Sequence, residues 1–145
     1  EMSATSTRVA ESAVIPAPID KVWEQVRSMK FDWWKLVKAT SMTSGTAADQ
    51  VGSNHTIEYQ DGSKWTIRLV ELSDLETSLS YEVVASEQPL PVTSAVHTIK
   101  LVKVTASNQT FFQWISNFSS DVTTEVIEDN KFKKLDAFKD LKAIQ

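Results

Sequence analysis

The side chains that could exchange protons or hydrogen bonds with a small molecule are spread between apolar residues of this sequence. They carry hydroxyls, indole N–H groups and one imidazole, and they belong to Tyr59, Trp65, Tyr81, His97, Trp114 and Ser116. Histidine titrates nearest to neutral pH, whereas phenols and indoles donate hydrogen bonds without ionising. The chemistry to consider is therefore proton transfer by His97, Tyr81 or Tyr59, or hydrogen bonding to a bound molecule.

His97 is open to three interpretations. It can be a satisfied histidine of a core or pocket wall, a hydrogen-bond partner of a ligand, or a general base. A base needs a substrate proton or an orienting carboxylate within reach. Strand alternation places Glu58 and Glu82 on outer faces, and Asp61 lies in a turn. No catalytic residue is therefore assigned, and His97, Tyr81 and Tyr59 stay candidates.

The sequence lacks the residues or residue patterns that cysteine catalysis, metal binding and phosphate binding require. The sequence has no cysteine, two histidines, and three glycines scattered at positions 45, 52 and 62. Cysteine nucleophiles and zinc–thiolate sites are excluded, and no phosphate-cradling glycine loop is present. His55 is expected near a loop and exposed to solvent. We therefore expect neither a metal nor a cofactor.

Helical spacing occurs near the start of the chain and at its end. After Pro18, which suits a first helical turn, apolar residues recur three and four positions apart. These residues are Ile19, Val22, Trp23 and Val26. A second, shorter helix is expected over Phe31–Leu36, and a long final helix over Val122–Lys142.

Alternating runs predict seven strands, separated by turn signals such as Asp61-Gly62. They cover residues 7–15, 38–43, 54–60, 64–72, 77–85, 93–105 and 109–118. This order predicts an α+β fold in which a curved seven-stranded antiparallel sheet wraps around the long C-terminal helix. Two short helices would follow the first strand.

The predicted inner face of the sheet is apolar and aromatic, with a few isolated polar atoms. Apolar walls with a few convergent hydrogen-bonding groups are typical of a small-molecule pocket. The residues expected to contact a ligand are Ile57, Tyr59, Trp65, Ile67, Tyr81, Val83, Ala95, His97, Ile99, Phe112, Trp114, Ser116 and Phe138. The plain alternative is that these side chains pack against one another as a core.

Composition limits the partners. A net charge of −4 disfavours nucleic acid, and no apolar run approaches a membrane span. The start of the chain lacks a signal-peptide core, so we expect a cytoplasmic protein, either a monomer or a weak dimer. Lys131, Lys133 and Lys134 lie among acidic residues and are expected on a solvated helix face. One domain is expected over residues 7–145, after a tail at 1–6.

Several short segments, in their order and spacing, carry a resemblance to a known superfamily. They are residues 14–23, 31–34, 51–53, 61–63, 89–91, the strand with Trp114, and residues 138–142. From Val9 to Leu141 the chain resembles the START-like helix-grip superfamily, also called Bet v 1-like or polyketide cyclase and lipid transport. In that superfamily a cavity between sheet and last helix holds sterols, lipids, polyketides, phenolics or hormones.

The resemblance implies a protein that binds or transports a hydrophobic small molecule of lipid, polyketide or phenolic type in this cavity. Two alternatives stay open. One is a cyclase or dehydratase-like enzyme that uses tyrosine and histidine for proton transfer in the same cavity. The other is a protein-interaction module whose cavity is closed.

The layout is also similar to that of the abscisic-acid receptors, in which a gate loop and a latch loop close over the ligand. The matching positions are residues 59–63 and 87–91, with Asp61, Gly62, Pro89, Leu90 and Pro91 as gating residues. The receptors' own motifs are absent there, so abscisic acid is not the expected ligand. We expect the loops at 44–53 and 87–91 to be mobile, because their composition predicts few fixed contacts.

Overall fold

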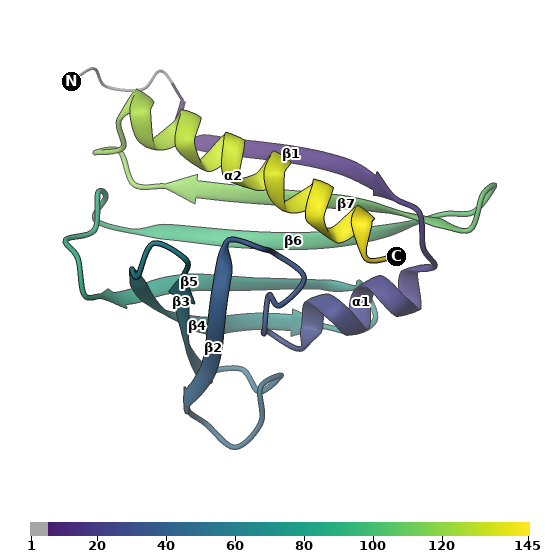
Figure 1. Cartoon of the computed structure of the whole chain (residues 1–145), viewed down its shortest axis with the longest axis horizontal. Coiled ribbons are helices and arrows are strands. Elements are labelled where there is room, and N and C mark those ends of the chain that lie inside the picture. Colours follow the sequence, from purple (N-terminus) through teal and green to yellow (C-terminus); the bar gives the residue numbers. More distant parts are fainter. Residues whose placement is uncertain (1–5) are drawn as a thin grey trace.

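The computed structural model describes residues 6–145, so residues 1–5 of the expected tail lie outside the described residues. The elements follow the order β-α-β-β-β-β-β-β-α (Figure 1). They are β1 (Arg8–Ile15), α1 (Ile19–Arg27), β2 (Val37–Ser44), β3 (Asn54–Tyr59), β4 (Lys64–Ser73), β5 (Ser78–Ser86), β6 (Ala95–Val104), β7 (Gln109–Phe118) and α2 (Thr124–Ala143).

The seven strands form one antiparallel sheet with the order β1-β7-β6-β5-β4-β3-β2. Strands β2 to β7 are neighbours in sequence and in space, joined by turns or, before β3 and before β6, by longer loops. β1 instead pairs with β7, from Arg8 opposite Asn117 to Ile15 opposite Thr110. The predicted seven-stranded antiparallel sheet and long terminal helix are therefore confirmed.

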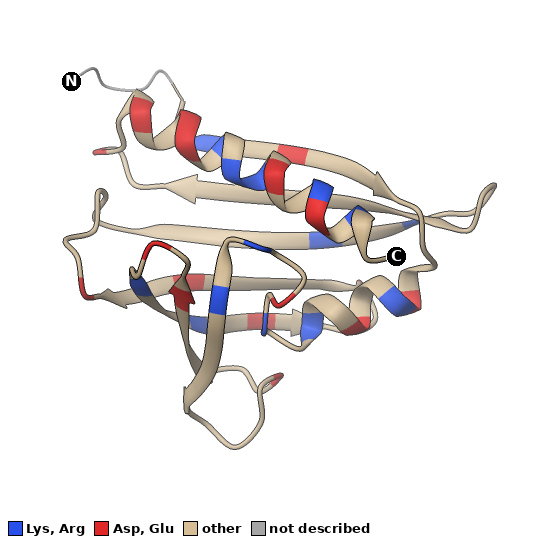
Figure 2. Cartoon of the chain, viewed as in Figure 1, with Lys and Arg blue, Asp and Glu red and all other residues tan. Residues whose placement is uncertain are grey.

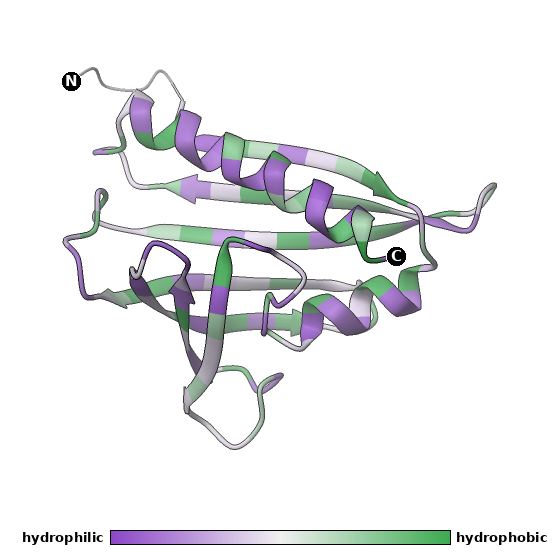
Figure 3. Cartoon of the chain, in the orientation of Figure 1, coloured by the Kyte–Doolittle hydropathy of each residue, from purple (hydrophilic) through white to green (hydrophobic). Residues whose placement is uncertain are grey.

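The sheet is strongly curved. Register shifts interrupt the β2–β3 and β4–β5 pairings, and such bulges bend and twist a strand. In Figure 1, β2 and β3 run steeply across the direction of β6 and β7, while α2 lies over the β1 and β7 side. Apolar and polar residues alternate along the strands (Figure 3), so that one face of the bent sheet is apolar. This curvature leaves room between β3–β6 and the start of α2.

α1 closes the far end of the sheet. Its apolar stripe buries Val22, Trp23 and Val26. Trp23 Nε1 donates a hydrogen bond of 2.8 Å to Asp74 Oδ1 in the β4–β5 turn, and Arg27 also pairs with Asp74. This contact holds the helix against a turn far away in the sequence.

The second short helix expected after α1 does not form. Residues 31–36 make two successive turns instead, with Trp34 N bonded to the carbonyl oxygen of Phe31 and Val37 N to that of Trp34, both at 3.0 Å. Met29 and Phe31 have φ angles of 60° and 52°, which a right-handed helix cannot contain. Burial of Phe31, Trp33 and Trp34 outweighs local helical preference here.

α2 begins two residues later than expected, with Thr123 as its N-cap, whose Oγ1 accepts a bond from Val126 N. Acidic and basic residues both occur along the visible side of this helix, with acidic residues first (Figure 2). The prediction that Lys134 shares a solvated face with Lys131 and Lys133 is wrong, because Lys134 is only 2% exposed. It lies on the same side as the other buried residues of this helix, Ala137, Phe138 and Leu141. Neither helix within residues 6–145 combines the length and hydropathy required to cross a bilayer.

Candidate functional site

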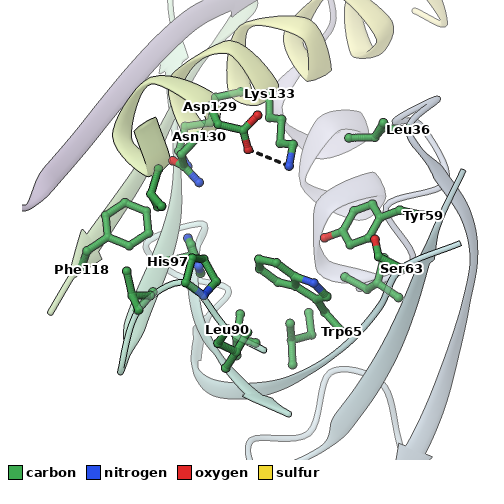
Figure 4. A pocket seen from close by; sticks show the side chains of 18 of the residues that line it. Leu36, Tyr59, Ser63, Trp65, Leu90, His97, Phe118, Asp129, Asn130 and Lys133 are labelled. Carbon is green, nitrogen blue, oxygen red and sulfur yellow. Dashed lines mark hydrogen bonds and ion pairs between the residues drawn. The ribbon is translucent and has the colours of Figure 1, made fainter. Parts of the chain in front are cut away.

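A cavity of about 450 Å³ lies between the concave face of the sheet and the first half of α2 (Figure 4). Strands β3 to β7, the loop after β5 and the segment after α1 supply its walls. Most of the lining surface is apolar and aromatic. The volume is within the range of about 300–1,000 Å³ that is typical of small-molecule pockets.

Nine of the residues expected to contact a ligand line this cavity. They are Ile57, Tyr59, Trp65, Ile67, Tyr81, Val83, Ala95, His97 and Trp114. Cross-strand register explains why they meet: Ile57 lies opposite Trp65 on β4, Ile67 opposite Val83 on β5. The same face of successive strands therefore builds one continuous wall.

Four other residues of that set do not line the cavity, although they lie on the same face of the sheet or on α2. They are Ile99, Phe112, Ser116 and Phe138, which are 0 to 2% exposed. The inward face extends beyond the hollow, towards the side where α2 packs. There Phe138 fills the space against Phe112, with ring centroids 5.2 Å apart. Ile99, Phe112 and Phe138 belong to the packed core behind the cavity, and Ser116 is buried next to the lining residues His97 and Lys134.

The two expected gating segments border the cavity in part. Asp61, Leu90 and Pro91 line it, as does Ser63, whereas Gly62 and Pro89 do not. Asp61 Oδ1 accepts hydrogen bonds from Ser63 N (2.9 Å) and Ser63 Oγ (2.6 Å). These bonds lower the pKa of Asp61 and hold the β3–β4 turn in one conformation.

The polar end of the cavity is a chain of hydrogen-bonded side chains from three elements. His97 on β6 lies opposite Ser116 on β7, and His97 Nδ1 is 2.5 Å from Ser116 Oγ. Lys134 on α2 donates to Ser116 Oγ and to Asn130 Oδ1, each at 2.5 Å. The Lys134 ammonium group also lies 5.0 Å from the ring centroid of Trp114, a cation–π contact.

The hydrogen bonds determine the form of His97. A protonated Lys134 can only donate to Ser116 Oγ, and the Ser116 hydroxyl has no acceptor other than His97 Nδ1 within residues 6–145. The arrangement that satisfies every group therefore has Ser116 donating to His97 Nδ1. His97 is then the tautomer that carries its proton on Nε2. Burial, and next the charge of Lys134, lower the pKa of His97 to about 3. The imidazole is therefore neutral at physiological pH.

Lys134 is affected by the same burial. Desolvation lowers its pKa from 10.5 to about 7, and the charge of Glu11 on β1 opposes this only in part. A buried amine of this kind is poised between its charged and neutral forms near neutral pH. It is the ionisable group of the cavity wall whose pKa lies closest to physiological pH.

Tyr81 and Tyr59 complete the polar groups of the wall. The Tyr81 ring stacks on His97 with centroids 5.1 Å apart, and Tyr59 contacts Trp34 and Trp65 edge-on. Burial raises the pKa of both hydroxyls, so they stay protonated. Neither hydroxyl donates a hydrogen bond to another group within residues 6–145, so both are available as donors, and the Trp114 indole N–H acts on the Tyr81 oxygen as a donor.

The sequence analysis missed the α2 side of the cavity. Its lining residues there are Glu125, Val126, Asp129, Asn130, Lys133 and Lys134, and Phe31, Trp34, Leu36 and Phe118 were also absent from the expected contacts. The helical spacing of the sequence did indicate that Lys134 is buried. It lies four residues before Phe138 and seven before Leu141, so it continues the apolar stripe of the helix.

The expectation for His55 is wrong: its side chain is 3% exposed. It shares a face of β3 with Ile57, and the loop before β3 covers it, with Ser53 Oγ 2.9 Å from His55 Nε2. Burial lowers the pKa of His55. His55 does not line the cavity, and within residues 6–145 no three His, Asp or Glu side chains gather as metal ligands.

Comparison with known proteins places this fold among solved structures. The model of the family described as polyketide cyclase / dehydrase and lipid transport matches residues 6–138. No curated protein matches the sequence. A Nitrosospira multiformis protein is similar over 94% of both chains, with 25% identity and a TM-score of 0.83.

Two further structures show the same fold. The protein XoxI from Bacillus cereus has 23% identity and a TM-score of 0.83, over 95% of this chain and 94% of its own. Major latex-like protein 151 from Panax ginseng has 15% identity and a TM-score of 0.76, over 94% of this chain and 95% of its own. The expected START-like, Bet v 1-like architecture is thereby confirmed.

Proposed function

Since this chain belongs to the polyketide cyclase / dehydrase and lipid transport family, we propose that its cavity binds or transports a hydrophobic small molecule. A lipid, polyketide or phenolic compound is the proposed class. The observation that carries the proposal is the cavity of about 450 Å³, whose walls are mainly aromatic and aliphatic. The open cavity supports this proposal over a protein-interaction module with a closed interior.

The walls suit a flat, ring-containing ligand. Tyr81, Trp65 and Trp34 line the interior, and aromatic rings favour offset or edge-on contacts with another ring. Burying about 300 Å² of apolar ligand surface contributes on the order of 7 kcal/mol before the costs of association. Those costs are about 4 kcal/mol or more, so apolar burial alone gives an affinity weaker than about millimolar, and polar contacts must add to it.

The loop after β5 is the proposed entrance cover. Leu90 and Pro91 line the cavity, and no ladder hydrogen bond fixes them to a neighbouring strand. The β3–β4 turn with Asp61 borders the same opening, but its own hydrogen bonds hold it. We therefore assign the closing movement to residues 87–92 rather than to the turn.

The test uses the neutral fluorescent probe N-phenyl-1-naphthylamine and a variant that fills the cavity. Val83→Phe adds a ring to the wall and should weaken probe binding by about tenfold or more. Val96→Phe is the matched control, because Val96 is exposed on the outer face of β6. Equal probe affinity for both variants and the unmodified protein would contradict binding in this cavity.

A cyclase or dehydratase activity is the second candidate, and the hydrogen-bonded chain from His97 through Ser116 to Lys134 is the observation in its favour. His97 is a weak base, because its pKa is about 3. For this candidate, His97→Ala and Tyr81→Phe should abolish conversion of a polyketide thioester while the naphthylamine probe still binds. Loss of probe binding together with conversion would instead support a role in binding alone.

A further inference from the structure

Lys134 is a buried cation without an acidic partner. Its side chain is 2% exposed, and within residues 6–145 no carboxylate lies at ion-pair distance from Nζ. Its contacts are the neutral oxygens of Ser116 and Asn130 and the face of the Trp114 ring. A buried charge normally requires an opposite charge to offset the loss of hydration.

The charged groups on neighbouring elements do not supply that partner. On α2 itself, Asp129 is paired with Lys133 at 2.8 Å and makes no ion pair with Lys134. Glu11 on β1 raises the pKa of Lys134, but burial outweighs it. On β5 and β6 the facing groups, Tyr81 and His97, are both neutral at physiological pH.

The same end of the cavity offers more hydrogen-bond donors than acceptors. The tautomer deduced above leaves an N–H on His97 Nε2, and the hydroxyl proton of Tyr81 has no acceptor within residues 6–145. Lys134 uses two of its three N–H groups on Ser116 and Asn130 and has one left. Groups of this kind are satisfied by an oxygen that accepts hydrogen bonds.

We infer that the natural ligand carries one anionic oxygen group, such as a carboxylate or phenolate, on an apolar body, and that Lys134 is its counter-ion. This inference rests on the proposed function and names the ligand class for the same cavity. The anionic end would lie beside Lys134, His97 and Tyr81, and the apolar body against Trp65, Ile57 and their neighbours. Only one such group is accommodated, because Lys134 is the single buried cation of the lining.

Two isosteric probes separate charge from shape. 2-Naphthoate is anionic at neutral pH, whereas 2-naphthamide has the same size and is neutral. Isothermal titration at pH 7 should give about tenfold or more tighter binding of 2-naphthoate. Lys134→Met should remove that advantage, with about tenfold weaker 2-naphthoate binding and 2-naphthamide binding unchanged within about threefold. Lys131→Met is the matched control, because Lys131 is exposed on the same helix and does not line the cavity.

A second measurement needs no variant. An anion beside Lys134 raises the pKa of its ammonium group again, so binding at pH 8 should take up close to one proton from the buffer. Titrations in buffers with different ionisation enthalpies measure this uptake. 2-Naphthamide should take up none. This readout decides the inference even if Lys134→Met does not fold.

The outcomes are distinguishable. Equal affinity of the unmodified protein for both probes, with no proton uptake, would overturn the ligand class and leave the binding function standing. Equal weakening of both probes by Lys134→Met would likewise show that Lys134 acts through packing alone. If neither probe binds, or if Val83→Phe affects neither, the proposed binding function itself is wrong.

Discussion

Ser116 Oγ lies 2.5 Å from His97 Nδ1, and this contact connects two groups that burial has pushed towards their neutral forms. Ser116 is the only side chain of residues 6–145 that bonds to both His97 and Lys134. One hydroxyl therefore satisfies a buried imidazole and a buried amine at once. The consequences for stability and pH dependence can be measured separately.

Ser116→Ala should destabilise the protein by about 1–3 kcal/mol, because it leaves His97 Nδ1 and one Lys134 N–H without a partner in a buried site. Urea unfolding monitored by tryptophan fluorescence measures the change. The matched control is Ser80→Ala, which removes a similar cross-strand bond of 2.9 Å to Thr98 on the partly exposed face. That change should cost less than about 1 kcal/mol. Equal losses for both variants would contradict the role given to Ser116.

His97 should make the protein less stable as the pH falls. Its pKa is about 3 in the folded state and about 6.5 in an unfolded chain, so the unfolded chain binds more protons between these values. The free energy of unfolding should therefore fall by about 1 kcal/mol per pH unit on acidification from pH 6.5 towards pH 3. His97→Gln should reduce this slope, measured by urea unfolding at several pH values.

The acidic groups provide the control for that experiment. Hydrogen bonds lower the pKa values of Asp61, Asp74 and Asp121. Protonation of these carboxylates on acidification therefore also lowers the free energy of unfolding of the protein. Their contribution is present in both proteins, and only the difference in slope reports His97. Identical slopes with and without His97 would mean that the imidazole is solvated in the folded state.

Lys134 should make the protein more stable as the pH rises above 7. Its folded pKa is about 7 and its unfolded pKa about 10.4, so the unfolded chain again binds more protons between them. The free energy of unfolding should rise from pH 7 towards pH 10 by about 1 kcal/mol per pH unit. Lys134→Met should remove this rise, whereas Lys131→Met should keep it. A rise that persists in Lys134→Met would assign the effect to another group.

The architecture was readable from the sequence because each strand alternates and each turn has its own signal. The run from Gln109 to Phe118 has the predicted ends. Its inward face was ambiguous in the sequence, because Phe111 and Phe112 are adjacent, and the structure places Phe112, Trp114 and Ser116 inward. The segment at 31–36 was not readable in this way. Three aromatic residues look compatible with a short helix, but their burial and the positive φ of Phe31 are properties of tertiary packing.

The site was predictable on the sheet side and not on the helix side. Strand alternation locates Tyr81 and His97, because a side chain on a strand has only two directions. The place of Lys134 depends on how α2 is rotated and on where it leaves the sheet. Its charge favoured an exposed position, and the apolar stripe through Phe138 and Leu141 favoured a buried one. In the structure Lys134 is buried on the apolar side of the helix.

Hydrogen exchange should separate the two loops that were expected to be mobile. Gly52 N donates to the carbonyl oxygen of Leu69 at 2.7 Å, Leu69 N donates to that of Ser53 at 3.0 Å, and Ser53 is fully buried. The amides of residues 52–53 should therefore be protected, whereas those of residues 88–92 should exchange rapidly. N-phenyl-1-naphthylamine should slow exchange only in the second segment. Rapid exchange at Gly52 and Ser53 would contradict the contacts described for that loop.

Trp114→Ala should cost on the order of 3–5 kcal/mol, because the indole joins the core to the cavity wall. Its ring is 3% exposed and contacts aromatic rings on several sides. These rings belong to Phe31, Trp33, Trp34, Phe112 and Phe138, with centroids 5.7 to 6.4 Å away.

The neighbouring cavity reduces the loss of stability expected for Trp114→Ala. One side of the Trp114 ring already borders open space, so its removal enlarges a hollow that the protein tolerates and the loss should lie in the lower half of the range. Phe132→Ala is the control, because that ring is 67% exposed and its truncation should change stability by less than about 0.5 kcal/mol. A loss below about 2 kcal/mol for Trp114→Ala would mean that water or mobile side chains already surround the ring. The packed boundary between core and cavity, on which the orientation of Lys134 depends, would then not exist.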